Sequence, residues 1–461
     1  MNPRVFREYD IRGAAERDFP DACVAELGDA VGEHLYEAGA RRITLARDCR
    51  LSSPRIHRVM RARLLAAGLS VQDIGLMHTP GLYFSVFHLE ADGGVMITAS
   101  HNPKQDNGFK IMRGKGTIFG AEVQELRQRI ERRHRGSKPP AVAPGEATEV
   151  DVLAPYIAYL VNNIALGPRR FKVVVDGGNG MGGMNCVSVL RQLGFDVDAL
   201  YCEPDGRFPN HHPDPTVPEN LAALVARIQE TGAEIGIALD GDGDRIGVVD
   251  PAGRIVWGDQ LLMLFAREIL RERPGATFVS EVVCSQVVYD DITARGGCAI
   301  MWKVGHSLIK TKMKEENAVM AGDMSGHMFF ADRYFGFDDA VYAAARVVEL
   351  LSRSKVPLSA IVDALPSVHN TPEIRVACPD DIKFEVVKRA REYYQGVYPT
   401  LPVSDVDGAR ISFSGGWGLV RASNTGPMLV LRCEAETAVR LAEIRAEIEG
   451  TLVRVKATLG A

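Results

Sequence analysis

The same order of segments occurs three times along this chain. Each copy runs strand, helix, strand, helix and strand, then a small polar loop and a further short strand. The strands before the loops lie at 93–98, 234–240 and 317–323, and the loops read TASHNP, DGDGDR and GDMSGH. Strands that alternate with helical segments are typical of parallel βαβ units. The repeat therefore predicts three similar mixed α/β domains.

The three polar loops are expected to face one another. In parallel α/β sheets, ligands bind beyond the carboxyl ends of the strands. Loops at corresponding strand ends are therefore candidates for one shared, central cleft. The other strands expected in the three copies lie at 42–47, 70–76, 171–176, 196–202, 276–282 and 298–304.

After residue 373 the repeat is lost, and the tail reads as a smaller α+β domain. A strand at EIRVAC, a helix around 381–395, a pair of strands and a closing helix follow one another there. Shifts in composition at 134–149, 250–254 and 365–373 mark linkers or turns. We therefore predict four domains, with the boundaries 1–150, 151–254, 255–366 and 367–461.

Composition excludes several classes of protein. The chain has 461 residues, of which 46% are hydrophobic and 25% charged, so each domain can have its own core. The net charge of −5 and the absence of a Lys/Arg run favour neither nucleic acid nor a membrane as partner. The charged N-terminus and the lack of a long apolar segment indicate a cytoplasmic protein. Eight scattered cysteines without a C-x-x-C motif are expected to be buried, reduced thiols.

The loop DGDGDR carries the strongest chemical signal. In an extended loop Asp240, Asp242 and Asp244 point the same way and can present three carboxylates to one hard cation. An EF-hand is excluded because Arg245 replaces its glycine and Pro251 its bidentate glutamate. Three carboxylates leave coordination open for an oxygen of a substrate or phosphate, which suits Mg²⁺.

Ser100 is ambiguous from its own loop. A serine before Asn-Pro at a strand end is commonly a turn or capping residue, and no G-x-S-x-G elbow surrounds it. Beside a three-carboxylate metal site its hydroxyl acquires another interpretation, because Lys110 and Arg245 would supply local positive charge. That combination favours phosphoryl transfer over acyl transfer.

Two further loops contain groups that suit a sugar phosphate. RASNTGP offers Arg421, Ser423, Asn424 and Thr425, a guanidinium and polar donors that match a dianionic phosphate. GDMSGH offers Asp323, Ser325 and His327, which suit sugar hydroxyls. Each segment is equally compatible with an ordinary turn.

One segment favours a different class of protein. VVVDGGNGMGG contains G-x-G-x-x-G at Gly178, Gly180 and Gly183, with Glu203 about twenty residues further on, as in a dinucleotide-binding fold. A nicotinamide-dependent dehydrogenase is therefore the alternative from another class. It leaves the triple-Asp loop, the Ser100 loop and RASNTGP without a role, so we read the glycines as a tight turn.

Taken together and in this order, the four polar loops resemble those of the α-D-phosphohexomutase family, and most closely its bacterial phosphomannomutase/phosphoglucomutase branch. The resemblance extends from FREYDIRG at 6–13 to the tail. It implies three α/β domains and a smaller fourth around a central cleft. It also implies reversible transfer of a phosphoryl group between the 1- and 6-positions of mannose or glucose phosphates, through a hexose 1,6-bisphosphate.

The resemblance also implies roles for individual residues. Ser100 would be carried as phosphoserine and bind Mg²⁺ together with Asp240, Asp242 and Asp244. Arg421, Ser423, Asn424 and Thr425 would hold the non-reacting phosphate, and Asp323 and Ser325 the 3- and 4-hydroxyls. The other positions expected to line the cleft are Tyr9, Arg12, His101, Lys110, Arg245, His306 and His327. Of these, Lys110 and His306 are the candidates for the acid and the base.

The family pattern leaves some features of this chain open. Asp323 stands where the sugar loop usually has the longer glutamate, and Gly426 replaces an acid in the phosphate loop. Met324 favours mannose and glucose over glucosamine, so phosphoglucosamine mutase is the alternative within the family. The resemblance further implies a hexose 1,6-bisphosphate activator and sugar phosphates as the binding partners of a monomer.

Overall fold

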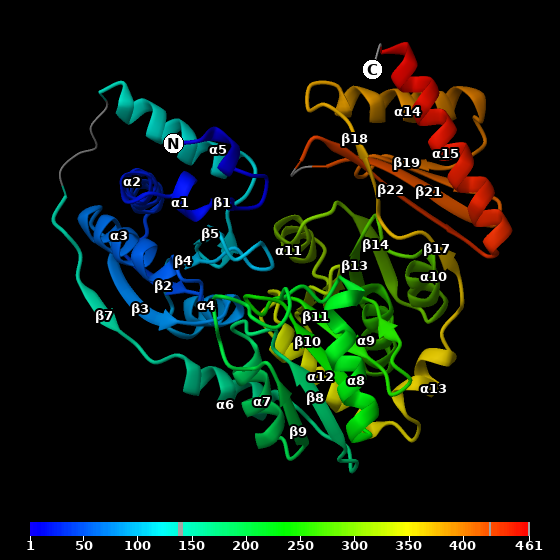
Figure 1. Ribbon diagram of the computed structural model, residues 1–461, viewed down its shortest axis with the longest axis horizontal. Helices are drawn as coiled ribbons and strands as arrows, with labels where there is room; N and C mark the ends of the chain where they lie inside the picture. Colours follow the sequence, from blue (N-terminus) through cyan, green and yellow to red (C-terminus); the bar gives the residue numbers. More distant parts are fainter. Residues whose placement is uncertain (137–141, 424–425, 460–461) are drawn as a thin grey trace.

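The computed structural model describes residues 1–136, 142–423 and 426–459. The described strands form four sheets that follow one another along the chain, and each sheet is the centre of one structural unit. Figure 1 shows the first unit in blue to cyan, the second and third in green to yellow, and the fourth in orange to red. The predicted fold class is confirmed: three similar α/β units precede a smaller α+β unit.

The first sheet has the strand order β1-β5-β4-β2-β3-β7, with β6 beside β5. Strands β4, β2 and β3 are parallel, and β5 returns antiparallel to β4. The strands are β1 (Ile11–Ala14), β2 (Arg42–Arg47), β3 (Ser70–Leu76), β4 (Gly93–Ile97), β5 (Asp106–Arg113), β6 (Gly116–Thr117) and β7 (Ala147–Glu149). The helices are η1 (Pro3–Val5), α1 (Ala15–Asp18), α2 (Asp21–Glu37), α3 (Ser53–Ala66), α4 (Thr79–His88) and α5 (Ala121–His134).

Strand β4 is apolar throughout because both of its faces are covered. Val95 and Ile97 belong to the apolar cluster under α2, α3 and α5, whereas Met96 belongs to the cluster that includes α4. A parallel strand between two helical layers needs such a continuous apolar run. The polar residues that follow β4 therefore begin where the strand leaves the core.

The second sheet has the order β12-β11-β10-β8-β9, with β10, β8 and β9 parallel. Its strands are β8 (Lys172–Asp176), β9 (Asp196–Leu200), β10 (Ile235–Leu239), β11 (Ile246–Val249) and β12 (Ile255–Val256). Its helices are α6 (Leu153–Asn163), α7 (Gly183–Gln192), η2 (Pro218–Leu221) and α8 (Ala222–Thr231).

The third sheet has the order β14-β13-β15-β16, with β16 antiparallel to β15. Its strands are β13 (Thr277–Glu281), β14 (Cys298–Trp302), β15 (Met320–Gly322) and β16 (Met328–Phe330). Its helices are α9 (Gly258–Glu272), α10 (Gln286–Ala294), α11 (His306–Glu315), α12 (Ala340–Arg353) and α13 (Leu358–Asp363).

The fourth sheet is antiparallel, with the order β17-β22-β21-β20-β19 and β18 beside β22. Its strands are β17 (His369–Asn370), β18 (Ile374–Ala377), β19 (Val403–Ser404), β20 (Ala409–Phe413), β21 (Gly416–Ala422) and β22 (Met428–Ala435). Helices α14 (Lys383–Val397) and α15 (Ala438–Thr458) pack on this sheet. Figure 1 shows this unit above the third one.

One continuous apolar core joins the first three units, and it includes Tyr83, Val175 and Phe330. The fourth unit has a separate core between its sheet and its two helices. A small cluster of Val282, Trp417 and Leu419 connects the fourth unit to the third. Because burial of apolar surface is the main stabilising term, the first three units are expected to unfold together.

The segments that composition marked as breaks contain additional pairing. Strand β7 lies within the linker predicted at 134–149 and pairs with β3, so part of that linker belongs to the first sheet. Strand β12 pairs with β11 beyond residue 254 and completes the second sheet. The eight cysteines are free, and five of them are buried as predicted, whereas Cys23 and Cys49 are half-buried and Cys298 is exposed. In the part of the chain that the structure describes, no helix is long and apolar enough to cross a membrane.

Candidate active site

Ser100 follows β4, where the chain leaves the core and turns back toward β5. Its φ of +51° lies in the left-handed region, which is uncommon for a residue other than glycine. Its backbone N–H donates to Thr98 Oγ1 at 2.9 Å, and the side chain is 1% exposed. Such backbone strain persists only where the surroundings hold it, and it is common at functional loops.

Arg50 holds this strained loop in place, and the sequence did not predict this role. The side chain is fully buried. Its guanidinium donates at 2.6–3.0 Å to four backbone carbonyls of the loop, those of Ser100, Asn102, Pro103 and Asp106. Its Nε lies 3.2 Å from Asp48 Oδ2, which compensates the buried charge. An arginine just after a strand gives no sequence signal for this role, because its acceptors lie fifty or more residues further along the chain.

The loop DGDGDR follows β10, and it touches the Ser100 loop directly. A Cβ at Gly241 would lie 2.3 Å from the carbonyl oxygen of Ser100, so only glycine permits this approach. The loop turns back on itself, since the N–H of Asp244 donates to Asp240 Oδ1 at 3.0 Å. The two loops that the repeat predicted to share a cleft are therefore in contact.

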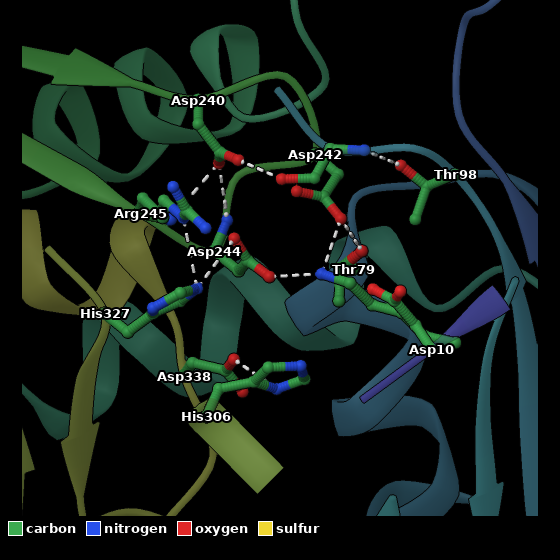
Figure 2. Close-up of polar contacts among 12 residues, drawn as sticks. Asp10, Thr79, Thr98, Asp240, Asp242, Asp244, Arg245, His306, His327 and Asp338 are labelled. Atoms are coloured by element: carbon green, nitrogen blue, oxygen red, sulfur yellow. Dashed lines mark hydrogen bonds and ion pairs between the residues drawn. The ribbon is translucent and has the colours of Figure 1, made fainter. Parts of the chain in front are cut away.

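Asp240, Asp242 and Asp244 are fully buried and present carboxylate oxygens that lie within 4.8 Å of one another. Ser100 Oγ donates to Asp240 Oδ2 at 2.6 Å. Figure 2 shows the three carboxylates converging. Burial, and then the charges of Asp244 and Asp242, raise the pKa of Asp240 well above its ordinary value. Such a cluster is costly unless a cation compensates it.

The donor set fits a hard divalent cation. Asp242 Oδ1 and Asp244 Oδ1 are buried, and neither has a hydrogen-bond partner among the residues described. Carboxylate and hydroxyl oxygens are the ligands that Mg²⁺ prefers. The three aspartates and Ser100 can therefore hold a metal ion, as the sequence predicts for this loop.

Lys110, on β5, supplies part of the compensating charge. Its Nζ donates to Asp242 Oδ2 at 2.8 Å and also to Asp244 Oδ2. Although burial opposes it, these two carboxylates hold the pKa of Lys110 well above its ordinary value. Thr79, which the sequence did not single out, donates to Asp242 Oδ2 at 2.6 Å from the start of α4.

His327 bridges the sugar loop and the acidic loop. Its Nδ1 lies 2.6 Å from Asp323 Oδ2, and its Nε2 lies 3.5 Å from Asp244 Oδ1 and 3.3 Å from Arg245 Nε. Burial would lower the pKa of His327, but Asp323 and Asp244 raise it to about 10 against the opposing charge of Arg245. These two carboxylates favour the protonated ring, which makes His327 a poorer candidate for the base than a histidine whose pKa is lowered.

His306 has the opposite character. It is buried at the start of α11, with its Nδ1 3.4 Å from Asp338 Oδ2. Burial lowers its pKa to about 4, with Lys310 contributing and Asp338 opposing. Neither ring nitrogen has a hydrogen-bond partner of good geometry within the described residues. Figure 2 shows His306 beside Asp338, and a carboxylate oxygen of Asp338 lies within 4.8 Å of one of Asp244.

A cavity of about 510 Å³ opens above these groups. Its lining includes residues from the first, second and third units, among them Tyr9, Arg12, His101, Arg245, His306, Asp323, Ser325 and His327, all of which the sequence predicted for the cleft. It also includes Asn102 and Glu281, which the sequence did not predict. Arg12 donates to Asn102 Oδ1 at 2.9 Å, and Tyr9 to the carbonyl of Val304 at 2.5 Å.

The predicted phosphate loop lies on the fourth unit. Arg421 donates through Nη2 to Asp407 at 3.0 Å, and the same carboxylate oxygen accepts the N–H of Val304 at 3.1 Å. Because Val304 lines the cavity, this contact places Arg421 next to its rim. The carbonyl oxygen of Ser423 accepts from Lys383 Nζ at 2.7 Å. Asn424 and Thr425 lie outside the described residues.

The glycines that suggested a dinucleotide site are used by the chain itself. A Cβ at Gly180 would lie 2.8 Å from the carbonyl oxygen of Gly241, and one at Gly183 would lie 2.8 Å from Cys202 Cα. Close approach of a pyrophosphate to this turn would require the same space. The geometry therefore favours the tight-turn interpretation over the dehydrogenase.

Three α/β units that line one cavity, a smaller fourth unit packed on the third, and a serine beside three carboxylates define the architecture of the α-D-phosphohexomutases. Comparison of the sequence with family models agrees. The models for the alpha/beta/alpha domains I, II and III of phosphoglucomutase/phosphomannomutase match residues 3–136, 154–253 and 257–369, and the model for its C-terminal domain matches residues 373–451. The chain belongs to the phosphoglucomutase/phosphomannomutase family.

Individual relatives match over nearly the whole chain. A phosphomannomutase/phosphoglucomutase of Pseudomonas aeruginosa is 42% identical over 458 residues, which cover 99% of this chain and 96% of that protein. A phosphoglucomutase of Neisseria gonorrhoeae is 41% identical, over 96% of this chain and 95% of that protein. The crystal structure of a phosphoglucomutase/phosphomannomutase family protein from Burkholderia thailandensis superposes with a TM-score of 0.92 at 37% identity, over 99% of this chain and 98% of that one.

Proposed function

We propose that this protein is a phosphohexomutase that interconverts the 1- and 6-phosphates of mannose, glucose or both. Ser100 is carried as phosphoserine, and its phosphoryl group passes to the free hydroxyl of the sugar phosphate to give a hexose 1,6-bisphosphate. The bisphosphate then reorients in the cavity so that its other phosphate faces Ser100, and that phosphoryl group is transferred back to Ser100. One observation supports this most directly: Ser100 Oγ lies 2.6 Å from Asp240, within a buried three-carboxylate cluster next to a cavity of about 510 Å³.

The first transfer breaks the bond between phosphorus and Ser100 Oγ and forms one to the sugar oxygen. Asp240, Asp242 and Asp244 would hold Mg²⁺, which supplies a Lewis acid for the transferring phosphoryl group. Lys110 remains charged beside the acidic loop and contributes positive charge where phosphate oxygens gather. The strained and buried Ser100 loop keeps Oγ in one position for both transfers.

The sugar hydroxyl must lose a proton as it attacks, and Ser100 Oγ must gain one. His306 is the better placed base, because it lines the cavity, its pKa of about 4 leaves it neutral at pH 7, and its Nε2 has no hydrogen-bond partner within the described part of the chain. Lys110, which is held protonated, is the candidate for the acid. In the second transfer both protons move in the reverse direction.

The two ends of the substrate need different partners. Asp323 and Ser325 line the cavity and would bind the 3- and 4-hydroxyls, which can be bound in both orientations of the sugar. Arg421, with Ser423, Asn424 and Thr425, would hold whichever phosphate is not reacting. The remaining cavity residues Tyr9, Arg12, His101, Arg245 and His327 would contact the substrate or the transferring phosphate.

Several finer assignments belong to the same proposal. They are Mg²⁺ as the metal, a hexose 1,6-bisphosphate as activator, a monomeric state, a cytoplasmic location, and the division of the chain at 150, 254 and 366. Binding partners are limited to sugar phosphates.

The deciding experiment is a coupled assay with mannose 1-phosphate, glucose 1-phosphate and glucosamine 1-phosphate, with and without Mg²⁺ and the bisphosphate. We expect Mg²⁺-dependent turnover of the first two sugars, and preferred turnover of the third would favour phosphoglucosamine mutase. Intact-mass measurement should find one phosphate on the wild type and none on Ser100→Ala. As a matched control we expect Ser188→Ala, on α7, to keep full activity. A Ser100→Ala variant with full activity would overturn the proposal.

A further inference from the structure

Glu281 occupies a position in the cavity to which neither the family motifs nor the sequence assign a role. It is the last residue of β13, at the carboxyl end of a parallel strand, where ligands of such sheets are bound. The side chain is 2% exposed and lines the cavity together with Asp323 and Ser325. A carboxyl group this deeply buried is costly unless it has a partner.

One carboxylate oxygen of Glu281 holds the sugar loop, and the other is available. Oε1 accepts the N–H of Met324, the residue between Asp323 and Ser325, at 3.1 Å. The neighbouring Ser280 Oγ donates to the carbonyl of Gly322 at 2.9 Å. Within the described residues, the hydrogen bond from Met324 to Oε1 is the one that the Glu281 carboxyl group makes, and Oε2 takes part in none. The end of β13 thus orders the loop and leaves one carboxyl oxygen for a ligand.

Asp323, the carboxylate expected to bind the sugar, is already engaged. Its Oδ1 accepts the N–H of His327 at 2.9 Å, and its Oδ2 lies 2.6 Å from His327 Nδ1. The aspartate at this position, which is shorter than the usual glutamate, therefore contacts His327 with both of its carboxylate oxygens. Glu281 also lies next to the loop 323–325, and its Oε2 does not contact His327.

The charges around Glu281 also suit a contact with a phosphorylated sugar. Burial, and then the charge of Asp323, raise the pKa of Glu281 to about 8, while Arg421 and His327 oppose the shift. The other titratable groups that sense its charge are Cys284 and Tyr289. At neutral pH the carboxyl group is therefore mostly protonated, so it can donate a hydrogen bond without repelling a phosphate held by Arg421.

We propose that Glu281 is a further substrate-binding residue, which donates a hydrogen bond from Oε2 to a sugar hydroxyl between the loop 323–325 and the phosphate held by Arg421. This inference rests on the proposed function for the identity of the ligand. It adds a third hydroxyl-binding group beside Asp323 and Ser325, because both oxygens of Asp323 are shared with His327. Discrimination between sugars then depends on β13 as well as on the loop.

The test compares binding of glucose 1-phosphate and of its 2-, 3- and 4-deoxy analogues by calorimetry. We expect Glu281→Ala to weaken binding of glucose 1-phosphate about tenfold, the effect of one lost hydrogen bond to a buried polar group. For the analogue that lacks the contacted hydroxyl, the same substitution should cost less than about twofold. Tyr289→Phe is the matched control, because it removes the hydroxyl that donates to the Glu281 backbone carbonyl at 2.7 Å without entering the cavity.

A role in ordering the loop alone gives a different pattern. Glu281→Ala would then weaken binding of all four ligands equally, and the proposal would be wrong. Glu281→Gln adds a second readout, since an amide can accept from Met324 and still donate. We expect wild-type binding to weaken above pH 8 as the carboxyl group ionises, and the Gln variant to lack this loss; an identical pH profile would also overturn the proposal. Because binding needs no turnover, a wild type that binds the ligand but does not interconvert hexose phosphates would reject the proposed function alone.

Discussion

The two ends of the site are built differently. At the Ser100 end, the groups proposed for chemistry bind the first and second units to each other: Ser100 to Asp240, and Thr79 and Lys110 to Asp242. These side chains are buried, and the core around them is shared by three units. At the Arg421 end, the fourth unit has its own core, and Figure 1 shows it as a separate body above the third unit.

The fourth unit is joined to the third by a limited set of contacts. Arg410 donates to the carbonyls of Val282 and Cys284, Glu434 accepts the N–H of Gln286, and Asp407 accepts that of Val304. This difference matches the requirements of the two ends. Phosphoryl transfer needs fixed geometry. A group that holds the non-reacting phosphate must instead release the sugar and bind it again when the intermediate reorients. We therefore expect the fourth unit to be the part that shifts during turnover.

The largest effect is expected at the acidic loop. Asp240→Asn keeps the shape of the side chain but removes the charge next to Ser100 Oγ, so kcat should fall about 10²–10³-fold and more Mg²⁺ should be needed. Steady-state kinetics over a range of Mg²⁺ concentrations measures both. Asp198→Asn, on β9 and away from the cavity, serves as the control and should behave as the wild type. Unchanged kcat in Asp240→Asn would remove this loop from the chemistry.

Arg50→Lys should have the next largest effect. Lysine keeps the charge but cannot reach four carbonyls with a planar fork, so the Ser100 loop should lose its fixed position. We expect kcat to fall about 10–100-fold with KM for the sugar nearly unchanged, because Ser100 takes part in the phosphoryl transfer and not in binding of the sugar. Single-turnover kinetics and thermal unfolding separate this from a general loss of stability, and Arg55→Lys, in a partly exposed ion pair on α3, is the control. An effect on KM alone would contradict the positioning role.

The Arg421 end should respond in the opposite way. Asp407→Ala removes the carboxylate that orients Arg421 and holds Val304, so KM should rise about tenfold while kcat changes less than about threefold. Asp405→Ala, an exposed position two residues earlier, is the matched control. If Asp407→Ala lowered kcat with unchanged KM, the contrast between the two ends would be lost.

The smallest effect concerns the shared core. Asp339 caps α12 and accepts hydrogen bonds from Tyr156 and Tyr334, and burial raises its pKa to about 7. Between pH 4 and 7 the folded state keeps a proton there that the unfolded state has lost, so this carboxyl group makes the protein less stable as pH rises through that range. Asp339→Asn should therefore raise Tm by a few degrees at pH 8 and have little effect at pH 4. Asp363→Asn, at an exposed site, should change neither value.

Much of the fold followed from periodicity. Strands expected at 42–47 and 70–76 are observed with the same bounds, because apolar runs buried between helical layers leave a clear signal. The linker at 134–149 was less well predicted, since β7 is a short strand whose pairing with β3 depends on a distant partner.

The sequence by itself determined which chemical groups are present and where each strand places them: the serine after β4, the three aspartates after β10, and the loop GDMSGH after β15. Repeat position was enough for this, because equivalent strand ends meet at one edge of their sheets. Only the tertiary structure decided the pKa values of these groups and which residues hold their loops in place. Burial and neighbouring charges lower the pKa of His306 and raise that of His327, and contacts across more than forty residues bring Arg50 to Ser100 and Glu281 to Met324. Such effects depend on distance in space and on desolvation, which the order of residues along the chain does not encode locally.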